Sequence, residues 1–345
     1  MSDGGPCEVV IASYLEPELV TRIATAQPRV RVTYEPSLLP VPRYPSDHGG
    51  SPPLLSSEQL ARWQSITAGA EVMFDFDWHE PATLPERCPH LRWIQATSAG
   101  VGGFMARTGL DRSALEVTTA AGTHAIPLAE FALMGALHFV KGMPQLSAWQ
   151  AEHRWERYAT QRLAGRRALV VGLGGIGRRT AESFAALGVE VWGMARRPHG
   201  DPIPGVTRTI ARAELDEALG VTDVLVIACP LTEETHHLIG AAQLARLPGH
   251  AVVVNIGRGP VIDEPALVAA LAERRIAGAC LDVFEHEPLE PDSPLWDLDN
   301  VIVSPHSAAT LAEENELLVE LFIDNLARYL DGRPRRNVYD AAAGY

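Results

Sequence analysis

Short apolar runs rich in β-branched residues alternate with helical patterns along most of the 345-residue chain. In the first third, these runs predict strands at residues 8–13, 30–35, 71–76, 91–98 and 115–120. Six more candidates follow, at residues 168–172, 189–194, 223–230, 251–257, 277–284 and 300–305. Near-continuous apolar strands separated by helices are typical of parallel sheets that are covered on both faces. Because this length favours more than one domain, the sequence predicts an α/β protein with two doubly wound parallel-sheet domains.

The net charge restricts the possible binding partners, and the cysteine pattern indicates the redox compartment. The chain has 43 Asp and Glu against 29 Lys and Arg, a formal net charge of −14, so we expect neither nucleic acid nor a membrane surface as a partner. The four cysteines are scattered and form no C-x-x-C pair, which favours free thiols in a reducing compartment. No leader pattern opens the chain and no apolar run has membrane-spanning length, so we expect a cytoplasmic protein.

A glycine-rich turn lies between a valine strand and an amphipathic helix, in the stretch LVVGLGGIGRRTAESFAALG. Gly172, Gly174 and Gly177 match the pattern G-x-G-x-x-G. In that pattern the first glycine permits the tight turn, the second lets the backbone approach a pyrophosphate, and the third lets the helix pack closely on the strand. The turn therefore predicts a dinucleotide site at the N-terminus of the helix. The alternative is a strand–helix turn that binds nothing.

The end of the following strand indicates which dinucleotide binds. A site for NAD places Asp or Glu about twenty residues beyond the loop, where it binds the ribose hydroxyls. Here Ala195 stands at that place, and Arg196 and Arg197 follow. The missing carboxylate and the added guanidinium groups suit a 2′-phosphate, so NADP(H) is favoured over NAD(H). The alternative is a pair of solvated arginines on a surface turn.

Three polar residues come just beyond the carboxyl ends of predicted parallel strands. Arg258 follows AVVVNIG, Glu287 follows AGACLDVF, and His306 follows NVIVSP. Because ligands of doubly wound sheets bind at the edge where such strand ends lie, we expect the three side chains to converge on one ligand. Each has a structural alternative: a turn cap for Arg258, a solvated loop acid for Glu287 and a structural histidine for His306. The adjacent His236 and His237 would not share one helix face, so no metal site is predicted.

Several motifs occur in the same order and at compatible spacing as in a known family: SAGVG, GTHAIPLAEFAL, VVGLGGIG, CPLTEETHHLI, VVNIGRGPVIDEPALVAAL, LDVFEHEPLEPDSPLW and NVIVSPHSA. Over about residues 91 to 331, the chain resembles the D-isomer-specific 2-hydroxyacid dehydrogenases, which include glyoxylate, hydroxypyruvate and phosphoglycerate dehydrogenases. The resemblance implies a Rossmann cofactor domain at residues 123–306, inserted into a flavodoxin-like substrate domain formed by residues 1–122 and 307–345.

The resemblance also implies roles for individual residues. His306 would give a proton to the substrate's carbonyl oxygen as hydride arrives, which suits imidazole because its pKa lies near neutrality. Glu287 would orient His306 and favour its protonated form. Arg258 would hold the substrate with its planar fork, together with the backbone N–H groups of Ala99 and Gly100. The residues implied in cofactor binding are Gly172, Gly174, Gly175, Ile176, Gly177, Arg196, Arg197, Cys229, Pro230 and Asp282, the last near the nicotinamide carboxamide. At Gly102, where the family often has an acid, the chain departs from the pattern, which leaves the loop conformation open.

The expected function is that of an NAD(P)-dependent oxidoreductase acting on a small 2-oxo or 2-hydroxy acid, such as glyoxylate or hydroxypyruvate. One alternative is a dinucleotide-sensing regulator without turnover, which has no need of a proton donor. Another is formate dehydrogenase, a relative in which glutamine pairs with the histidine. The apolar helix at 125–142 corresponds to a two-fold contact in the family, so we expect a homodimer; the alternative is a buried core helix. The loop at 36–56, rich in Pro, Ser and Gly, is either functional or a floppy insertion.

Overall fold

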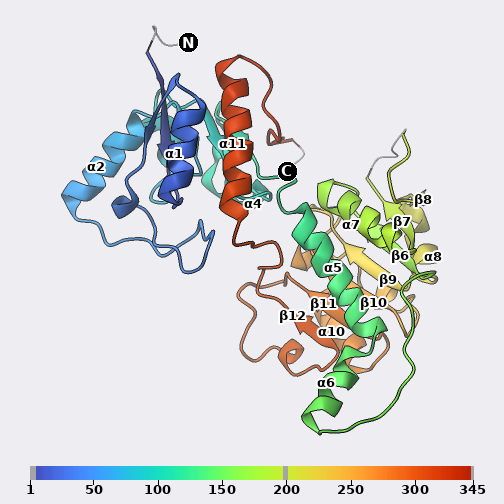
Figure 1. Cartoon of the computed structure of the whole chain (residues 1–345). Helices are drawn as coiled ribbons and strands as arrows, with labels where there is room; N and C mark the ends of the chain where they lie inside the picture. Colours follow the sequence, from blue (N-terminus) through green and yellow to red (C-terminus); the bar gives the residue numbers. More distant parts are fainter. Residues whose placement is uncertain (1–4, 197–200, 343–345) are drawn as a thin grey trace. The chain divides into compact units, whose positions relative to one another are not determined.

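The computed structural model describes residues 5–196 and 201–342, and the chain divides into two compact units (Figure 1). Unit 1 consists of Met1–Thr123 and Thr310–Tyr345, and unit 2 of His124–Ala309. In each unit, one parallel sheet carries helices on both faces. The predicted α/β class with two doubly wound parallel sheets is confirmed.

The sheet of unit 1 has five strands in the order β2-β1-β3-β4-β5. They are β1 (Cys7–Ile11), β2 (Val30–Thr33), β3 (Val72–Phe74), β4 (Trp93–Gln95) and β5 (Glu116–Thr118). One face is covered by α2 (Ser57–Ala68), α3 (Leu84–Arg87) and α4 (Gly102–Thr108), and the other by α1 (Pro17–Ala26) and α11 (Glu314–Leu330). Figure 1 shows α1 and α11 side by side on that second face. Three short 3-10 helices complete the unit: η1 (Pro36–Leu38), η2 (Pro81–Thr83) and η3 (Leu110–Arg112).

The last helix of the chain is fixed to the sheet of unit 1 by an aromatic stack and a buried polar network. The ring of Trp93 stacks on Phe322 and Tyr329 of α11, with centroid separations of 5.4 and 5.7 Å. Beside it, Thr118 Oγ1 and Asn325 Nδ2 each donate a hydrogen bond to Gln95 Oε1 at 2.9 Å. Because a buried polar group without a partner is unfavourable, this network permits only one position of α11 on the sheet.

The sheet of unit 2 has seven strands in the order β12-β11-β10-β9-β6-β7-β8. They are β6 (Arg167–Val171), β7 (Glu190–Met194), β8 (Arg208–Ile210), β9 (Val224–Ile227), β10 (Val252–Asn255), β11 (Gly278–Leu281) and β12 (Val301–Val303). The chain starts in the middle at β6, moves outward to β8, then returns to β9 and continues to the other edge. The strand order therefore reverses between β6 and β9, and ligands of such sheets bind at the carboxyl ends of the strands beside this reversal.

Two helical layers enclose the sheet of unit 2. One contains α5 (Ala125–Val140) and α7 (Gly175–Ala186), and the other α8 (Leu215–Leu219), α9 (Ala241–Leu244) and α10 (Glu264–Ala272). The approach of α5 is close, because a Cβ on Gly135 would lie 2.6 Å from the Cβ of Cys280 in β11. The remaining short elements are α6 (Met143–Ala151), η4 (Arg212–Glu214), η5 (Gly259–Val261) and η6 (Pro294–Trp296).

Two elements of unit 2 are not anticipated by the sequence pattern. β8 is the three-residue edge segment RTI, in which only Ile210 is buried, so it lacks an apolar run. α6 has no buried residue, so its sequence needs no apolar stripe at helical spacing. All four cysteines are free and buried. No single helix in the described part of the chain is long and apolar enough to cross a membrane, although α5 and α6, bent by 65°, pass together by length and composition.

Candidate active site

The glycine loop of unit 2 joins β6 to α7 beside the reversal in strand order. Gly172 has a φ of +100°, and a Cβ there would lie 2.7 Å from Cys229 N and 2.8 Å from Ala228 O, so a side chain is excluded both by conformation and by space. A Cβ on Gly177 would lie only 1.8 Å from Gly172 O. The first turn of α7 therefore packs directly on the loop.

The outer side of the same loop is open. A Cβ on Gly174 or Gly175 would meet no atom within 4 Å, and the N-cap residue of α7, Gly174, makes no side-chain capping bond. Ile176, in the first turn of α7, is partly buried against the core. The first N–H groups of a helix attract anions, because they lack partners within the helix and lie at the positive end of its dipole. The loop thus fits a dinucleotide pyrophosphate.

The end of β7 lies beside this loop, because Gly172 N–H donates to Met194 O at 2.8 Å. Ala195 follows directly and is partly buried, and Arg196 comes next and is exposed. This strand end therefore offers a methyl group and a guanidinium where an NAD site has a carboxylate. Arg197 lies outside the described residues.

Cys229 and Pro230 follow β9 on the other side of the glycine loop. Burial raises the pKa of the Cys229 thiol to about 11, so Cys229 is a neutral thiol and not a nucleophile at neutral pH. Pro230 is exposed, and its carbonyl accepts a hydrogen bond from Thr235 Oγ1 at 2.8 Å. Cys229 and Pro230 thus lie beside the glycine loop that is expected to bind the dinucleotide.

Arg258 follows β10, and a buried asparagine fixes its backbone. Asn255 Nδ2 donates to Arg258 O at 3.1 Å, while Asn255 Oδ1 accepts from Gly257 N–H at 3.1 Å. Arg258 Nη1 donates to Gly257 O at 2.7 Å. Burial lowers the pKa of the guanidinium and the charge of Glu287 raises it, but arginine remains protonated in proteins. The strand end therefore presents a partly buried cation that suits a carboxylate.

Glu287 and His306 meet directly, although 19 residues separate them. His306 Nδ1 lies 2.7 Å from Glu287 Oε2, and Glu287 Oε1 accepts from Phe284 N–H at 3.1 Å. The hydrogen bond that His306 donates to Glu287 raises the pKa of His306. Burial acts to raise the pKa of Glu287, but the bonds from His306 and Phe284 and the charges of His306 and Arg258 outweigh it and lower the pKa. Arg258, Glu287 and His306 thus influence one another's pKa values. Because Nδ1 of His306 is bonded to Glu287, the nitrogen on the other side of the ring, Nε2, remains to meet a ligand.

Asp282 organises the turn that carries His306. Its Oδ1 accepts hydrogen bonds from Ser304 Oγ at 2.6 Å and from the N–H groups of Ser307 and Ala308, both at 2.9 Å. His306 itself has a left-handed backbone with a φ of 54°, which the bonds on either side hold in place. Burial raises the pKa of Asp282, and these bonds oppose the rise. Asp282 therefore has a structural task in addition to the cofactor contact expected from the sequence.

The two backbone donors expected to bind substrate lie in unit 1, after β4. Ala99 is partly buried and Gly100 is exposed, and Gly100 N–H donates to Ser98 Oγ at 3.2 Å. The next residues, Gly102 and Gly103, begin α4. The departure from the family pattern at Gly102 thus leads into a helix, and a ligand that binds Gly100 N–H has to displace or share the Ser98 hydroxyl.

Two supporting residues were missed in the sequence. Asn255, in VVVN, is 1% exposed, and a polar residue ending a valine run is a signal that could have drawn attention to it. Gly259 belongs to the motif VVNIGRGPVIDEPALVAAL, and a Cβ there would lie 1.8 Å from Phe284 O. That close approach brings the Arg258 turn against the segment that carries Glu287.

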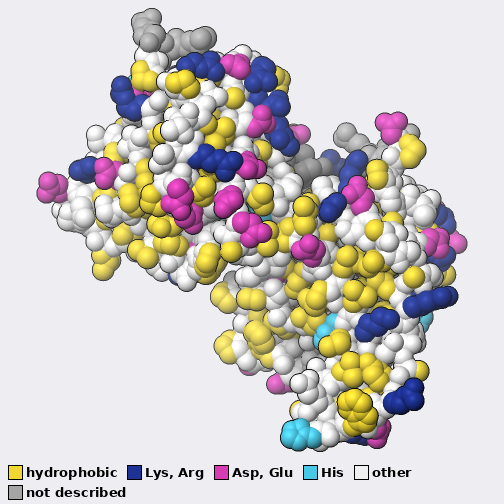
Figure 2. All heavy atoms as spheres, viewed as in Figure 1, with side chains coloured by type: hydrophobic (Ala, Val, Ile, Leu, Met, Phe, Trp, Pro, Cys, Tyr) yellow, Lys and Arg dark blue, Asp and Glu magenta, His cyan; other side chains and the backbone are white. Residues whose placement is uncertain are grey.

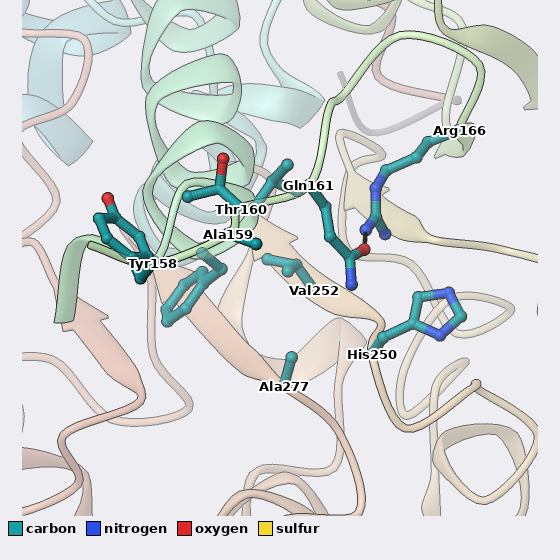
Figure 3. A pocket seen from close by; sticks show the side chains of 11 residues that line it. Tyr158, Ala159, Thr160, Gln161, Arg166, His250, Val252 and Ala277 are labelled. Atoms are coloured by element: carbon teal, nitrogen blue, oxygen red, sulfur yellow. Dashed lines mark hydrogen bonds between the residues drawn. The ribbon is translucent and has the colours of Figure 1, made fainter. Parts of the chain in front are cut away.

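Unit 2 also has a hollow at the opposite, amino ends of its strands (Figure 3). Its volume is about 280 Å³, and its lining includes Tyr158, Gln161, Arg166 and His250. Figure 3 shows the Gln161 and Arg166 side chains joined by a hydrogen bond at its rim. Since the glycine loop, Arg258 and His306 follow the carboxyl ends of their strands, this hollow is separate from the candidate site.

Comparisons with known proteins identify the family to which the chain belongs. The model of the D-isomer specific 2-hydroxyacid dehydrogenase NAD binding domain matches residues 133–308. Glyoxylate/hydroxypyruvate reductase B from Escherichia coli is 33% identical over 290 residues, which cover 82% of this chain and 88% of that protein.

Solved structures extend the similarity over nearly the whole chain. A D-isomer specific 2-hydroxyacid dehydrogenase from Xanthobacter autotrophicus, in complex with NADPH and MES, is 30% identical, with a TM-score of 0.78 and coverage of 99% of this chain and 100% of that chain. An NADPH-dependent glyoxylate/hydroxypyruvate reductase from Sinorhizobium meliloti, in complex with NADP and sulfate, is 28% identical, with a TM-score of 0.78 and coverage of 98% and 100%.

Proposed function

Because the chain belongs to the D-isomer-specific 2-hydroxyacid dehydrogenase family, we propose that it is an NADP(H)-dependent reductase of small 2-oxo acids, with glyoxylate and hydroxypyruvate as candidate substrates. The observation that carries this proposal is the His306–Glu287 pair, 2.7 Å apart, within the electrostatic reach of Arg258. Unit 2 would hold the cofactor and unit 1 would contribute to substrate binding.

The bound nicotinamide supplies the hydride for the substrate's carbonyl carbon. In the proposed mechanism, His306 Nδ1 is occupied by Glu287, so Nε2 is the nitrogen that gives a proton to the carbonyl oxygen. Glu287 raises the pKa of His306, which keeps more of the imidazole protonated near neutral pH. Arg258 holds the carboxylate of the substrate through charge-assisted hydrogen bonds.

Preference for NADP(H) is supported by the end of β7. Ala195 cannot accept hydrogen bonds from ribose hydroxyls as a carboxylate does, and the exposed guanidinium of Arg196 suits a 2′-phosphate. Gly174 and Gly175, where a Cβ would meet nothing within 4 Å, leave room for the pyrophosphate. The relatives from Xanthobacter and Sinorhizobium were solved with NADPH and NADP, which supports the same preference.

We further propose that the protein forms a homodimer through α5, α6 and the segment after them. Although one side of α5 is buried on the sheet, Ile126 is 52% exposed, Met134 42% and Met143 40%, and Trp155 is 96% exposed. Figure 2 shows hydrophobic side chains gathered over these helices of unit 2. Apolar patches of this kind mark protein–protein contacts, and the net charge of −14 disfavours nucleic acid as a partner.

The test is a panel of 2-oxo acids assayed with both cofactors. We expect oxidation of NADPH, followed by its absorbance, with glyoxylate or hydroxypyruvate, and a lower kcat/KM with NADH. If NADPH binds but none of the 2-oxo acids is reduced, the chain is a dinucleotide sensor instead. Reduction of the oxidised cofactor by formate would favour formate dehydrogenase, against which Glu287, in place of glutamine, already argues.

A further inference from the structure

The turn between Val41 and Ser51 in unit 1 is a closed structure. The N–H groups of these two residues each donate to the other's carbonyl at 2.9 Å. Inside the turn, the Asp47 carboxylate accepts from Arg43 N–H, Nε and Nη2 at 3.0, 2.7 and 3.1 Å, and from Gly50 N–H at 3.0 Å. The bonds from Arg43 and Gly50 lower the pKa of Asp47, so the carboxylate stays charged and the turn stays closed at neutral pH.

The closed turn holds His48 against the carboxyl edge of the sheet. His48 Nδ1 lies 3.0 Å from Ser13 Oγ, just beyond β1. Its ring meets the ring of Phe74, the last residue of β3, edge to face at a centroid distance of 6.2 Å. The other ring nitrogen, Nε2, is buried and has no hydrogen-bond partner among the residues that the structure describes. Because a buried ring nitrogen without a partner is unfavourable, Nε2 is suited to bind a polar ligand atom.

Asp75 is the second polar group of this cluster. It follows β3 directly and has a left-handed backbone with a φ of 68°. Its Oδ1 accepts from Phe76 N–H at 2.9 Å and its Oδ2 from Thr97 Oγ1 at 3.0 Å. Burial raises the pKa of Asp75, and the hydrogen bonds from Phe76 and Thr97 oppose the rise. Since each carboxylate oxygen has two lone pairs, Asp75 can accept a further hydrogen bond from a ligand.

The cluster lies at the same sheet edge as the proposed carboxylate loop. Ser13, Asp75 and Thr97 follow β1, β3 and β4, which are neighbours in a parallel sheet. Their carboxyl ends therefore point to one edge. Thr97, bonded to Asp75, stands two residues before Ala99. The cluster thus borders the loop that would bind the substrate's carboxylate.

The arrangement does not make Ser13 a hydrolytic nucleophile. In a catalytic triad, serine and acid bind opposite nitrogens of the imidazole, and the acid holds the tautomer. In unit 1, Ser13 is the partner of Nδ1 and Nε2 has none among the described residues, so Asp75 does not complete a triad. Ser13 instead fixes the orientation of the His48 ring.

We propose that His48 Nε2 and the Asp75 carboxylate form a subsite for the C3 hydroxyl group of hydroxypyruvate. The subsite rests on the proposed function and specifies it: among small 2-oxo acids, the preferred substrate carries a hydroxyl on C3. A hydroxyl needs one donor and one acceptor. We assign Ser13 Oγ as the donor to Nδ1 of a neutral His48, which leaves Nε2–H as the donor to the ligand hydroxyl and Asp75 as its acceptor.

The same pair rejects two related substrate classes. Pyruvate has a methyl group where hydroxypyruvate has a hydroxymethyl group, so it would leave the buried polar atoms of His48 and Asp75 without partners. Sites built to bind a hydroxyl discriminate strongly against the analogue that lacks it. A 2-oxo dicarboxylate would bring its second carboxylate, which only accepts hydrogen bonds, against the acceptor oxygens of Asp75, so the two groups could not satisfy each other.

The experiment compares hydroxypyruvate, pyruvate and glyoxylate in the full-length protein and in two His48 variants. In His48→Asn the amide replaces the Nδ1 side of the ring and leaves Nε2 unreplaced, whereas His48→Gln reaches the Nε2 position. We expect the wild type to prefer hydroxypyruvate over pyruvate by about 100-fold in kcat/KM. His48→Asn should lower the ratio of kcat/KM for hydroxypyruvate to that for pyruvate by about 10-fold or more, and His48→Gln should partly restore this ratio.

A second measurement records binding without turnover. The protein saturated with NADP⁺ has no hydride to transfer, so the Kd of hydroxypyruvate and of pyruvate can be measured by titration calorimetry. We expect the ratio of these two Kd values to fall toward 1 in His48→Asn. The matched control is His90→Asn, which changes an exposed histidine of unit 1. It should leave the hydroxypyruvate-to-pyruvate ratios of kcat/KM and of Kd unchanged. Thermal unfolding of each variant reports whether unit 1 remains folded.

The outcomes separate this subsite from the proposed function. If the wild type reduces glyoxylate but does not prefer hydroxypyruvate over pyruvate, the proposed subsite is wrong, whereas the proposed reductase function is retained. An equal loss with all three acids in His48→Asn would mean that His48 only supports the fold, which also overturns the subsite. If the wild type reduces none of them, the proposed function fails and the subsite fails with it.

Discussion

The carboxyl edges of the two sheets are built in different ways. In unit 2, the polar groups follow their strands closely and bind one another: Glu287 binds His306 at 2.7 Å, and Asp282 accepts three hydrogen bonds from the turn that carries the histidine. In unit 1, His48 comes from a closed turn distant in sequence from β3, and its Nε2 has no partner among the described residues. On the proposed assignments, the edge in unit 2 carries out the chemistry common to all substrates, and the edge in unit 1 selects among them.

This contrast follows from what each task requires of the protein. Proton transfer needs a histidine whose orientation and pKa are set before substrate arrives, so its partners belong to the protein. Selection needs polar atoms whose best partner is the ligand, so that a wrong substrate leaves them unsatisfied. Substitutions at the two edges should therefore differ in how their effects depend on the substrate.

The largest effect is expected for His306→Gln. Glutamine is uncharged and cannot supply the proton, so kcat should fall by about 10³-fold, and by the same factor for glyoxylate and hydroxypyruvate. NADPH binding, measured by fluorescence titration, should stay within about 2-fold of the wild type. A loss of kcat that differs between the substrates would contradict the proposal that the sheet edge of unit 2 serves all substrates alike.

Glu287→Gln should reduce kcat/KM by about 10²-fold at neutral pH and also shift its pH dependence. In the proposed mechanism, reduction requires protonated His306, whose pKa Glu287 raises above its ordinary value. Wild-type activity is therefore retained at low pH and lost as pH rises through the raised pKa. Without the carboxylate charge this pKa falls, so the loss of activity should occur at lower pH. An unchanged profile of kcat/KM against pH would show that Glu287 does not set the protonation of His306.

Gly177→Ala and Gly174→Ala form a matched pair within unit 2. The added methyl on residue 177 would overlap Gly172 O, whereas on residue 174 it would meet nothing within 4 Å. We expect Gly177→Ala to destabilise the protein by about 1–3 kcal/mol, measured by denaturant unfolding. Gly174→Ala should unfold as the wild type does and mainly weaken NADPH binding. Equal stability of the two variants would contradict the close packing of α7 on the loop.

The smallest effect is expected for Ala195→Asp, which adds a carboxylate at the end of β7. This carboxylate can bind ribose hydroxyls and repels a 2′-phosphate, so the ratio of kcat/KM with NADPH to that with NADH should fall by about 10-fold. The ratio of hydroxypyruvate to pyruvate should not change, because that selection is assigned to unit 1. An unaltered cofactor ratio would remove Ala195 and Arg196 from the argument for NADP(H).

The sequence predicts those features that depend on residues close together in the chain. Each apolar run from Val9 to Val303 that reads as a strand forms one, and the glycine pattern around Gly172 lies between a strand and a helix as expected. The positions of Arg258, Glu287 and His306 could be inferred because each stands just beyond a strand, and the parallel order of the strands then brings them to one edge.

The remaining features depend on tertiary contacts that no local pattern encodes. His48 lies in a stretch rich in Pro, Ser and Gly, and nothing in that composition shows that Asp47 closes the turn or that Ser13 receives the imidazole. β8 is short and partly polar, so its pairing with β7 is decided by the neighbouring strand. Asp282 carries three hydrogen bonds, which only the folded turn at residues 304–308 can supply.

The arrangement of the two units along the chain has a consequence for the order in which they can fold on the ribosome. Unit 2 is one continuous stretch, and its last strand is made by residue 303. Unit 1 supplies the first residues, yet its sheet lacks the helix that stacks on Trp93 until residue 330 has emerged. Because domains generally fold as units during synthesis, unit 2 can be completed before unit 1, whose Trp93 receives its stacking partners only after the whole of unit 2 has been made.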